Sequence, residues 1–463
     1  MAIQNIEHPM MKYSNRTKNS YREMEKAANY LPGGVTANIK HFSPYPVVME
    51  SAGGAWIKDV DGNQYIDYLM AYGSLALGHG HDDIKQAMAD QLAKDGTVLF
   101  GTPHPLEYRF AEKIQAYYPS MERLRYTNSG TEATLLAIRL ATAYTGKKRI
   151  AKFEGHYHGG YNEVLYSINP PLVAAGEMDD PRPVPESSGL EMFTDQRPVI
   201  LPFNRWQATE RLLRQHADEL AAVIIEPVQG GFIPAEKQFI EDLRKLTATL
   251  QIALIFDEVK TGFRVAMGGA QELYGVKPDL TTLGKVVGGG FPIGIVGGKE
   301  AILNRSRPKG NGDVFDVGQG KSSAAREILF HSGTYNGHPT ILAAGLAAIH
   351  RLEQDFAHTV LYTETMRKDI EALGRKNGIP LKAVGVGTIF NVVCTETTIR
   401  HYRDLQKTDL ELRKQIDFHL LNEGIYTKPL NRYSISTAHG ERELELTLTA
   451  YETVLKRVFK KKN

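Results

Sequence analysis

Residues 253–290 read ALIFDEVKTGFRVAMGGAQELYGVKPDLTTLGKVVGGG, and this stretch decides the fold. An apolar run at 253–257 ends on an aspartate, and a second candidate strand at 280–283 ends beside a glycine and Lys285. A short run that is apolar throughout, rather than at alternate positions, indicates a strand covered on both faces. We therefore predict two buried strands of an α/β domain, with Asp257 ending the first and Lys285 just beyond the second.

The alternation of short strands with helices continues on both sides of this stretch. Further strands are predicted at Leu124–Thr127, Ile150–Phe153, Ala222–Glu226 and Ile293–Val296, and helices at Glu132–Tyr144 and Phe239–Leu250. This order is typical of a doubly wound α/β domain with a mostly parallel sheet between helix layers. Two stretches rich in Pro, Gly, Ser, Asp or Lys are predicted to be long loops, at 170–198 and 306–327.

The two ends of the chain predict a smaller α+β domain. Residues 48–68 have a hairpin pattern with Asp61, Gly62 and Asn63 as its turn. The predicted C-terminal elements are a long helix from about Ala343, a glycine-rich strand region at 385–393, and helices at 410–422 and 441–460. We expect residues 1–68 and 336–463 to form the small domain around a large domain of residues 69–335.

The composition excludes several classes of function. Of 463 residues, 55 are Lys or Arg and 53 are Asp or Glu, a balance that disfavours nucleic acid or an anionic membrane as partner. The single cysteine, Cys394, excludes an intrachain disulfide and a cysteine-based metal cluster. The first 21 residues are polar, and no later segment reaches the length of a membrane span, so we expect a cytoplasmic protein.

The sequence NSGTEA at 128–133 lies between a predicted strand and a predicted helix. Ser129 and Glu132 have the spacing of a capping box, which alone predicts only a well-capped helix. Free amides at such a helix start, together with the hydroxyls of Ser129 and Thr131, are also suited to hold a phosphate. Both interpretations are open at this point.

Asp257 and Lys285 supply an acid and an amine in the same α/β region. A carboxylate at the end of a buried strand can pair with a protonated ring nitrogen. Such acids also bind metals or cap helices, but no histidine or acid cluster with metal spacing lies nearby, and we predict no metal. A lysine amine must be unprotonated to act as a nucleophile, so its ordinary pKa of about 10.4 must be lowered.

Lys285 alone would be taken for a surface lysine on a turn. The phosphate-binding helix start, the acid and the amine occur together, however, and this combination predicts a cofactor site.

The chain resembles the class III aminotransferases, which have the fold type I of pyridoxal 5′-phosphate enzymes, from about Pro32 to the C-terminus. The motifs that carry the resemblance are NSGTEA at Asn128, FEGHYHG at Phe153, IIEPVQG at Ile224, LIFDEVKTGFR at Leu254, DLTTLGKVVGGG at Asp279 and SGTYNGHP at Ser332. The resemblance implies pyridoxal 5′-phosphate as cofactor and a large doubly wound domain with a small α+β domain built from both termini.

The resemblance also implies a role for each matching residue. Lys285 forms a Schiff base with the cofactor, Asp257 pairs with its ring nitrogen, Tyr157 stacks on the ring and Val259 covers the other face. The phosphate is bound by Ser129, Gly130 and Thr131. Glu226 lies near the cofactor, and His158 either bonds near the ring or simply fills its loop. Thr334 reaches the phosphate of a neighbouring subunit, which implies a homodimer with shared sites.

Within the family, the chain is most similar to the glutamate-1-semialdehyde aminomutase branch and to its transaminase relatives that act on β-amino acids or D-arylglycines. That branch has the pattern GGVNSPVRxF, whose arginine grips the substrate carboxylate, where this chain has GGVTANIKHF with Lys40. A lysine keeps the charge but lacks the bidentate fork. Lys40 therefore either binds a carboxylate loosely or is a solvated charge.

Several departures from the aminomutase pattern favour a transaminase. EPVxGN is EPVQGG here, AGTxSGNP is SGTYNGHP, and the loop after His158 is longer. Gly231 replaces the glutamate of ornithine-type enzymes. Two further residues are candidates for substrate contacts. Arg432 either binds a keto-acid carboxylate or forms a surface ion pair. Tyr72 either lines the substrate pocket or packs in the core.

We therefore predict an aminotransferase that moves an amino group from an amine or amino acid, including β- or D-amino acids, to a keto acid by a ping-pong mechanism. The alternative is an intramolecular aminomutase. A silent binding protein of the same fold is disfavoured because both Lys285 and Asp257 are present.

Overall fold

A computed structural model describes residues 9–190, 197–308 and 328–460 of the chain. The chain divides into two compact units. The larger unit comprises residues 83–353 and 399–404, and the smaller one residues 1–82, 354–398 and 405–463. Each unit is thus assembled from segments that are distant in the sequence. The domain limits expected at residues 68 and 335 stay a prediction.

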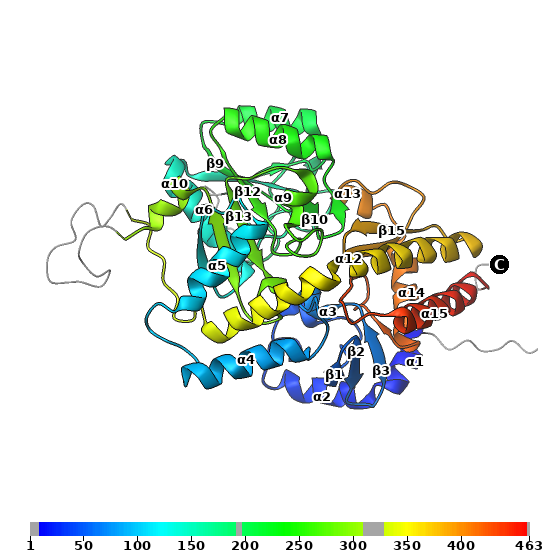
Figure 1. Ribbon diagram of the computed structural model, residues 1–463. Coiled ribbons are helices and arrows are strands. Elements are labelled where there is room, and N and C mark those ends of the chain that lie inside the picture. The colour runs from blue at the N-terminus through cyan, green and yellow to red at the C-terminus, as the bar shows by residue number, and fades with distance from the viewer. Residues whose placement is uncertain (1–8, 191–196, 309–327, 461–463) are drawn as a thin grey trace, which may run out of the picture. The chain divides into compact units, whose positions relative to one another are not determined.

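The larger unit is built on a seven-stranded sheet (Figure 1). Its strands, in spatial order, are β4 (Arg123–Thr127), β14 (Gly294–Gly298), β13 (Leu280–Gly284), β12 (Ala253–Asp257), β9 (Leu220–Ile225), β5 (Arg149–Phe153) and β8 (Val199–Leu201). β14 runs antiparallel to both of its neighbours, and the other pairs are parallel. The mostly parallel sheet predicted from the sequence is therefore confirmed, and so are its six predicted strands.

Helices cover both faces of this sheet. Helix α6 (Gly130–Thr145) packs its buried residues against Ile224, Ile255 and Leu280 of the sheet. On the other face, Phe239 of α8 (Lys237–Thr249) meets Phe153 of β5, with ring centroids 5.8 Å apart. Both helices were predicted. Of the remaining helices of eight or more residues, α5 (Pro105–Tyr117) and α7 (Trp206–Gln215) lie wholly in this unit, and α4 (Asp82–Asp95) lies in it from its second residue on.

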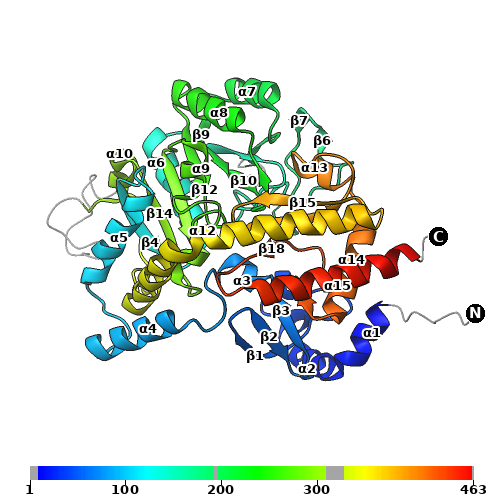
Figure 2. The same ribbon diagram turned by 45° about the vertical axis from the view of Figure 1, so that its right-hand side comes forward.

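The smaller unit combines segments from both ends of the chain (Figure 2). Strands β1 (Met49–Gly53), β2 (Trp56–Asp59) and β3 (Gln64–Asp67) form antiparallel pairs, as the hairpin pattern predicts, and β17 (Ile425–Tyr426) adds to β3 in parallel. A second sheet contains β15 (Leu381–Val386), β16 (Ile389–Cys394) and β18 (Tyr433–Ser434). The C-terminal elements predicted from the sequence are thus present.

Helices of this unit close its core around Met366, Phe390, Ile416 and Tyr451. They are α14 (Leu410–Asn422), α15 (Glu441–Lys460) and the later part of α12 (Pro339–Lys376). Helix α1 (Pro9–Arg16) instead packs Met10 and Tyr13 into a second cluster, and α2 (Lys18–Ala28) follows it in the same unit. Cys394 is buried. Within the described ranges, no helix is long and apolar enough to cross a membrane.

The two predicted loops are described only in part. The first contains a short hairpin of β6 (Gly176–Glu177) and β7 (Asp180–Pro181), and its residues 191–196 lie outside the described residues. Of the second, residues 309–327 lie outside the described residues.

Gly294 is the point where the antiparallel strand β14 approaches the start of α6. A Cβ atom there would lie 2.1 Å from the backbone oxygen of Ser129 and 2.3 Å from Oγ1 of Thr127. We expect Gly294→Ala to lower the free energy of unfolding by about 2 kcal/mol, because a methyl group inserted into packed structure forces a backbone shift. Urea denaturation measures this loss.

The matched control is Gly53→Ala, because a Cβ at Gly53 would meet no atom within 4 Å. This variant should change stability by less than about 0.5 kcal/mol. Equal stability of the two variants would contradict the close packing at Gly294.

Candidate active site

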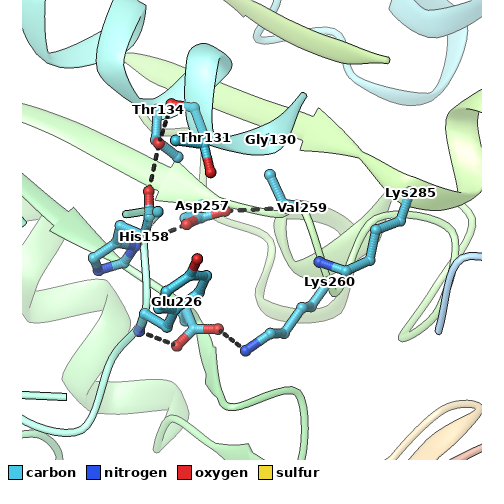
Figure 3. Close-up of a pocket in the computed structure, with 11 residues that line it drawn as sticks. Gly130, Thr131, Thr134, His158, Glu226, Asp257, Val259, Lys260 and Lys285 are labelled. Atoms are coloured by element: carbon cyan, nitrogen blue, oxygen red, sulfur yellow. Dashed lines mark hydrogen bonds and ion pairs between the residues drawn. The ribbon is translucent and has the colours of Figure 1, made fainter. Parts of the chain in front are cut away.

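A cavity of about 240 Å³ lies at the carboxyl ends of the central strands of the larger unit (Figure 3). Asp257 ends β12, Glu226 follows β9 and Lys285 follows β13. In doubly wound sheets this edge is where ligands bind. The cavity is lined by Gly130, Thr131, Thr134, Tyr157, His158, Gly159, Glu226, Asp257, Val259, Lys260 and Lys285.

The start of α6 forms one end of the cavity. Oγ of Ser129 accepts a hydrogen bond from the Glu132 amide at 3.1 Å, and the Glu132 carboxylate accepts one from the Asn128 amide at 2.8 Å. Ser129 therefore caps the helix, while Gly130 and Thr131 line the cavity. Because the first amides of a helix have no partner within it, this end is suited to an anion such as phosphate.

Asp257 is held in place by three groups. Its Oδ2 lies 2.7 Å from Nδ1 of His158, and its Oδ1 accepts hydrogen bonds from the Val259 amide at 3.1 Å and the Thr282 hydroxyl at 3.3 Å. Asp257 and His158 are both almost fully buried. The His158 ring thus has Asp257 as its partner, and its role near a cofactor ring stays a prediction.

Lys285 lines the cavity, and its backbone is strained. Its φ is +51°, in the left-handed region that non-glycine residues rarely adopt. Gly289, at the end of the turn that follows, also has a positive φ, of +61°. Figure 3 shows the Lys285 side chain extending into the cavity. Strain of this kind persists where the surrounding structure fixes it, and it is common at functional sites.

Glu226 and Lys260 form an ion pair on the side of the cavity away from Gly130 (Figure 3). Nζ of Lys260 lies 2.9 Å from Oε1 of Glu226, and Oε2 of Glu226 accepts the Tyr157 amide at 3.0 Å. Burial alone would raise the pKa of Glu226, but Lys260, two nearby histidines and the Tyr157 amide hold this pKa well below its usual range. Glu226 therefore stays an anion.

Sequence reasoning missed Lys260 as a lining residue. The signal was available, because Lys260 follows Val259 directly in the motif LIFDEVKTGFR. Its partner Glu226 is distant in sequence, however, and nothing local reveals the pairing. Thr134 and Gly159 were missed as well.

Thr334 lies apart from this cavity. Within the larger unit it lines a second cavity, of about 620 Å³, together with residues 99–104 and other residues of the SGTYNGHP motif. Its predicted role toward a neighbouring subunit stays a prediction.

The three predicted substrate contacts belong to the smaller unit. The Tyr72 hydroxyl donates to the backbone oxygen of Ile39 at 2.7 Å, next to the exposed Lys40. Burial raises the pKa of Tyr72 and the charge of Arg432 opposes this rise, so these two side chains lie near each other. The structure thus brings Lys40, Tyr72 and Arg432 into one neighbourhood.

No group of three His, Cys, Asp or Glu side chains in the part of the chain that the structure describes is arranged to hold a metal ion.

The chain matches the family described as aminotransferase class-III over residues 38–438. The glutamate-1-semialdehyde 2,1-aminomutase of Ignicoccus hospitalis is 39% identical to it, over 93% of this chain and 97% of that protein. Among solved structures, an omega-transaminase from Sphaerobacter thermophilus is 35% identical with a TM-score of 0.86, covering 95% of this chain and 97% of its own. A β-phenylalanine aminotransferase from Variovorax paradoxus is 30% identical with a TM-score of 0.83, covering 97% and 96%.

Replacing Lys260 by an uncharged residue tests how much the ion pair between Lys260 and Glu226 contributes to stability. In Lys260→Met the buried Glu226 loses its closest cation, and we expect stability at neutral pH to fall by about 3 kcal/mol. Thermal unfolding of the wild type and the variant measures the difference. Lys245→Met, which removes an exposed ion pair with Asp242, should cost less than about 0.5 kcal/mol.

The difference in stability between the wild type and Lys260→Met should also depend on pH. A carboxyl with a depressed pKa stabilises the fold above its ordinary pKa, and this contribution is lost as the pH falls through the folded value. Without Lys260, burial raises the pKa of Glu226, so protonation relieves the unpaired charge. The gap in melting temperature should therefore narrow from about pH 8 to about pH 5. A constant gap would contradict this account.

Proposed function

We propose that this chain, which belongs to the class III aminotransferase family and uses pyridoxal 5′-phosphate, moves an amino group of an amino-acid substrate. The observation that carries the proposal is the cavity in which helix amides, a buried carboxylate and a lysine amine converge. These groups suit three chemically different parts of one small molecule.

The residues of the cavity fit the cofactor that the family uses. The amides at the start of α6 suit its dianionic phosphate. Asp257, fixed by His158 and Thr282, suits a protonated ring nitrogen. The amine of Lys285 suits its aldehyde, and Tyr157 and Val259 offer an aromatic and an aliphatic surface to a flat ring.

In the proposed reaction each residue has a limited task. When bound, the cofactor supplies an electron sink for the charge that develops at the substrate carbon. Asp257 keeps the ring nitrogen protonated by its negative charge. Nζ of Lys285 takes a proton from the substrate carbon and returns it, as a general base and then a general acid. The ion pair of Glu226 and Lys260 forms the side of the cavity away from Gly130.

Two functions within the family remain to be separated. Two curated relatives at 39% identity are glutamate-1-semialdehyde 2,1-aminomutases, and they favour the aminomutase over the transaminase predicted first from the sequence. We therefore propose the aminomutase as the first function to test.

A transaminase is the second candidate, and specific residues favour it. Lys40 stands where the aminomutase pattern has arginine, and the EPVQGG and SGTYNGHP segments depart from that pattern. The solved structures at 35% and 30% identity are transaminases. A lysine in place of an arginine weakens a planar grip on a carboxylate, which fits a change of substrate.

Product analysis separates the two functions. The purified protein, loaded with pyridoxal 5′-phosphate, is given glutamate-1-semialdehyde alone, and separately a panel of amines and of α-, β- and D-amino acids with pyruvate or 2-oxoglutarate. Formation of 5-aminolevulinate without a second substrate supports the aminomutase. Ketone formation that requires a keto acid supports the transaminase.

Lys285→Ala is the control for either outcome. We expect its rate to fall by a factor of at least about 10², because a positioned general acid and base is lost. After borohydride reduction the wild type should retain the cofactor covalently, as a mass increase on the peptide with Lys285, and the variant should not. Retention by the variant would contradict the proposed role of Lys285.

We also propose that the chain forms a homodimer through the face around Thr334. Exposed aromatic and aliphatic side chains gather in the two segments that line this second cavity or adjoin it; they include Val98, Phe100, Tyr108, Phe330 and Tyr335. Exposed apolar surface of this kind commonly marks a contact with another protein.

Sedimentation velocity tests this proposal. We expect a mass about twice the 51.5 kDa of one chain. Tyr335→Asp places a charge in the proposed interface, and it should shift the protein toward the monomer and weaken cofactor binding. Tyr30→Asp, at an exposed tyrosine of the other unit, should do neither. A monomeric wild type would contradict the proposal.

A further inference from the structure

Arg403 lies in a short segment that belongs to the larger unit although the chain on both sides of it belongs to the smaller one. This segment comprises residues 399–404. The side chains of Ile399, Tyr402 and Arg403 are buried. A segment this short adds little to a hydrophobic core, so its specific polar contacts indicate what it does.

The guanidinium of Arg403 is fully engaged. Its Nε and Nη2 donate to the two carboxylate oxygens of Glu154 at 2.7 and 2.9 Å. The remaining hydrogen bonds go to the backbone oxygens of Ala175, Gly176 and Glu177, at 3.3, 2.9 and 3.2 Å. A bidentate pair fixes direction as well as distance, because both groups are planar.

Glu154 connects this pair to the candidate active site. It follows the last residue of β5 and lies three residues before Tyr157, which lines the cofactor cavity. Its amide donates to the backbone oxygen of Leu201 at 3.0 Å, so the backbone here is bound to the sheet on one side and to Arg403, through the side chain, on the other.

Tyr402 fixes the same backbone by direct packing. Gly155 has a φ of +81°, and a Cβ at this position would lie 2.5 Å from Cβ of Tyr402. The Tyr402 hydroxyl also donates to the backbone oxygen of Pro170 at 3.2 Å. Residues 154 and 155 are therefore enclosed by the returning segment just before the chain reaches Tyr157.

These backbone anchors contribute to the orientation of Tyr157. Its own amide is bound to Glu226, and the residue is 45% exposed. Its side chain is hydrogen-bonded to Thr131, and Nζ of Lys260 lies 5.9 Å from the ring centroid. These two contacts restrain the hydroxyl and one side of the ring, and the backbone of residues 154–157 sets the position from which the ring extends. Catalytic groups hold a productive geometry only when neighbouring residues restrict them.

We propose that Arg403 is a positioning residue for Tyr157: through Glu154 it fixes the backbone that presents the Tyr157 ring to the bound cofactor. This inference rests on the cofactor site of the proposed function. Arg403 does not touch the cofactor in this account, and it acts only through the segment 154–157.

The competing explanation is purely structural. Arg403 would then only tie residues 175–177 to the sheet, and its loss would lower stability without any link to Tyr157. The two explanations differ in whether the effects of Arg403 and Tyr157 on cofactor binding are coupled.

A double-mutant cycle measures this coupling. The probe is pyridoxamine 5′-phosphate, which has no aldehyde, so its binding to the full-length protein does not involve covalent attachment to Lys285. Its dissociation constant is measured by calorimetry for the wild type, Arg403→Lys, Tyr157→Ala and the double variant. A cycle of this kind isolates the interaction between two residues.

We expect Arg403→Lys to weaken binding roughly three- to tenfold, the range of a lost aromatic contact. In the Tyr157→Ala background the same substitution should have no further effect. The matched control is Arg400→Lys in the same segment, where an exposed arginine pairs with Glu236. Its dissociation constant should equal that of the wild type.

Two results would overturn the inference: unchanged probe binding by a folded Arg403→Lys variant, or an equal loss of binding with and without the Tyr157 ring. If Arg403→Lys does not fold, Glu154→Gln, which keeps the shape of the side chain and removes its charge, replaces it in the same cycle with the same expected result. Failure of the wild type to bind the probe would overturn the cofactor site itself, and the inference with it.

Discussion

The candidate active site depends on the alternation of side chains along β12. Successive residues of a strand point to opposite faces, so Ala253, Ile255 and Asp257 share one face. Ala253 and Ile255 pack in the core beneath α6, which places Asp257 on the face where α6 begins. A register slip of one residue would turn Asp257 to the opposite face and separate the carboxylate from the helix amides.

The same alternation explains why much of the fold and of the cofactor site could be predicted. Apolar runs, glycine turns and a helix start are local signals, and they identified six strands together with Asp257, Lys285 and the start of α6. β8 was missed because three residues carry too little pattern. The reversal of β14 is set by its pairing with β4 and β13, which no local pattern encodes.

The parts of the site that could not be predicted are contacts between distant residues. Lys260 meets Glu226 across 34 positions, and Arg403 meets Glu154 across 249. Both are nearly buried ion pairs, and such pairs stabilise a fold only when further hydrogen bonds satisfy the remaining polar atoms. Because those partners are backbone groups brought together by folding, a charged residue in the sequence gives no sign of them.

The turn that carries Tyr72 has an unusual backbone conformation. Met70, Ala71 and Tyr72 all have positive φ, of 45°, 49° and 57°. The left-handed conformation costs roughly 1–2 kcal/mol per non-glycine residue, so three in a row are strongly unfavourable by themselves. Oδ1 of Asp67 offsets part of this cost, because it accepts the Leu69 and Met70 amides at 2.8 and 3.1 Å.

This turn places the Tyr72 hydroxyl against the backbone oxygen of Ile39, next to Lys40, and the Tyr72 side chain near Arg432. Met70 is fully buried, so the turn also serves packing, and backbone strain of this kind is common where a side chain meets a ligand. The proposed cofactor site thus depends on the sheet edge of the larger unit, and the proposed substrate contact of Tyr72 depends on this turn, where we propose to look for the choice between aminomutase and transaminase substrates.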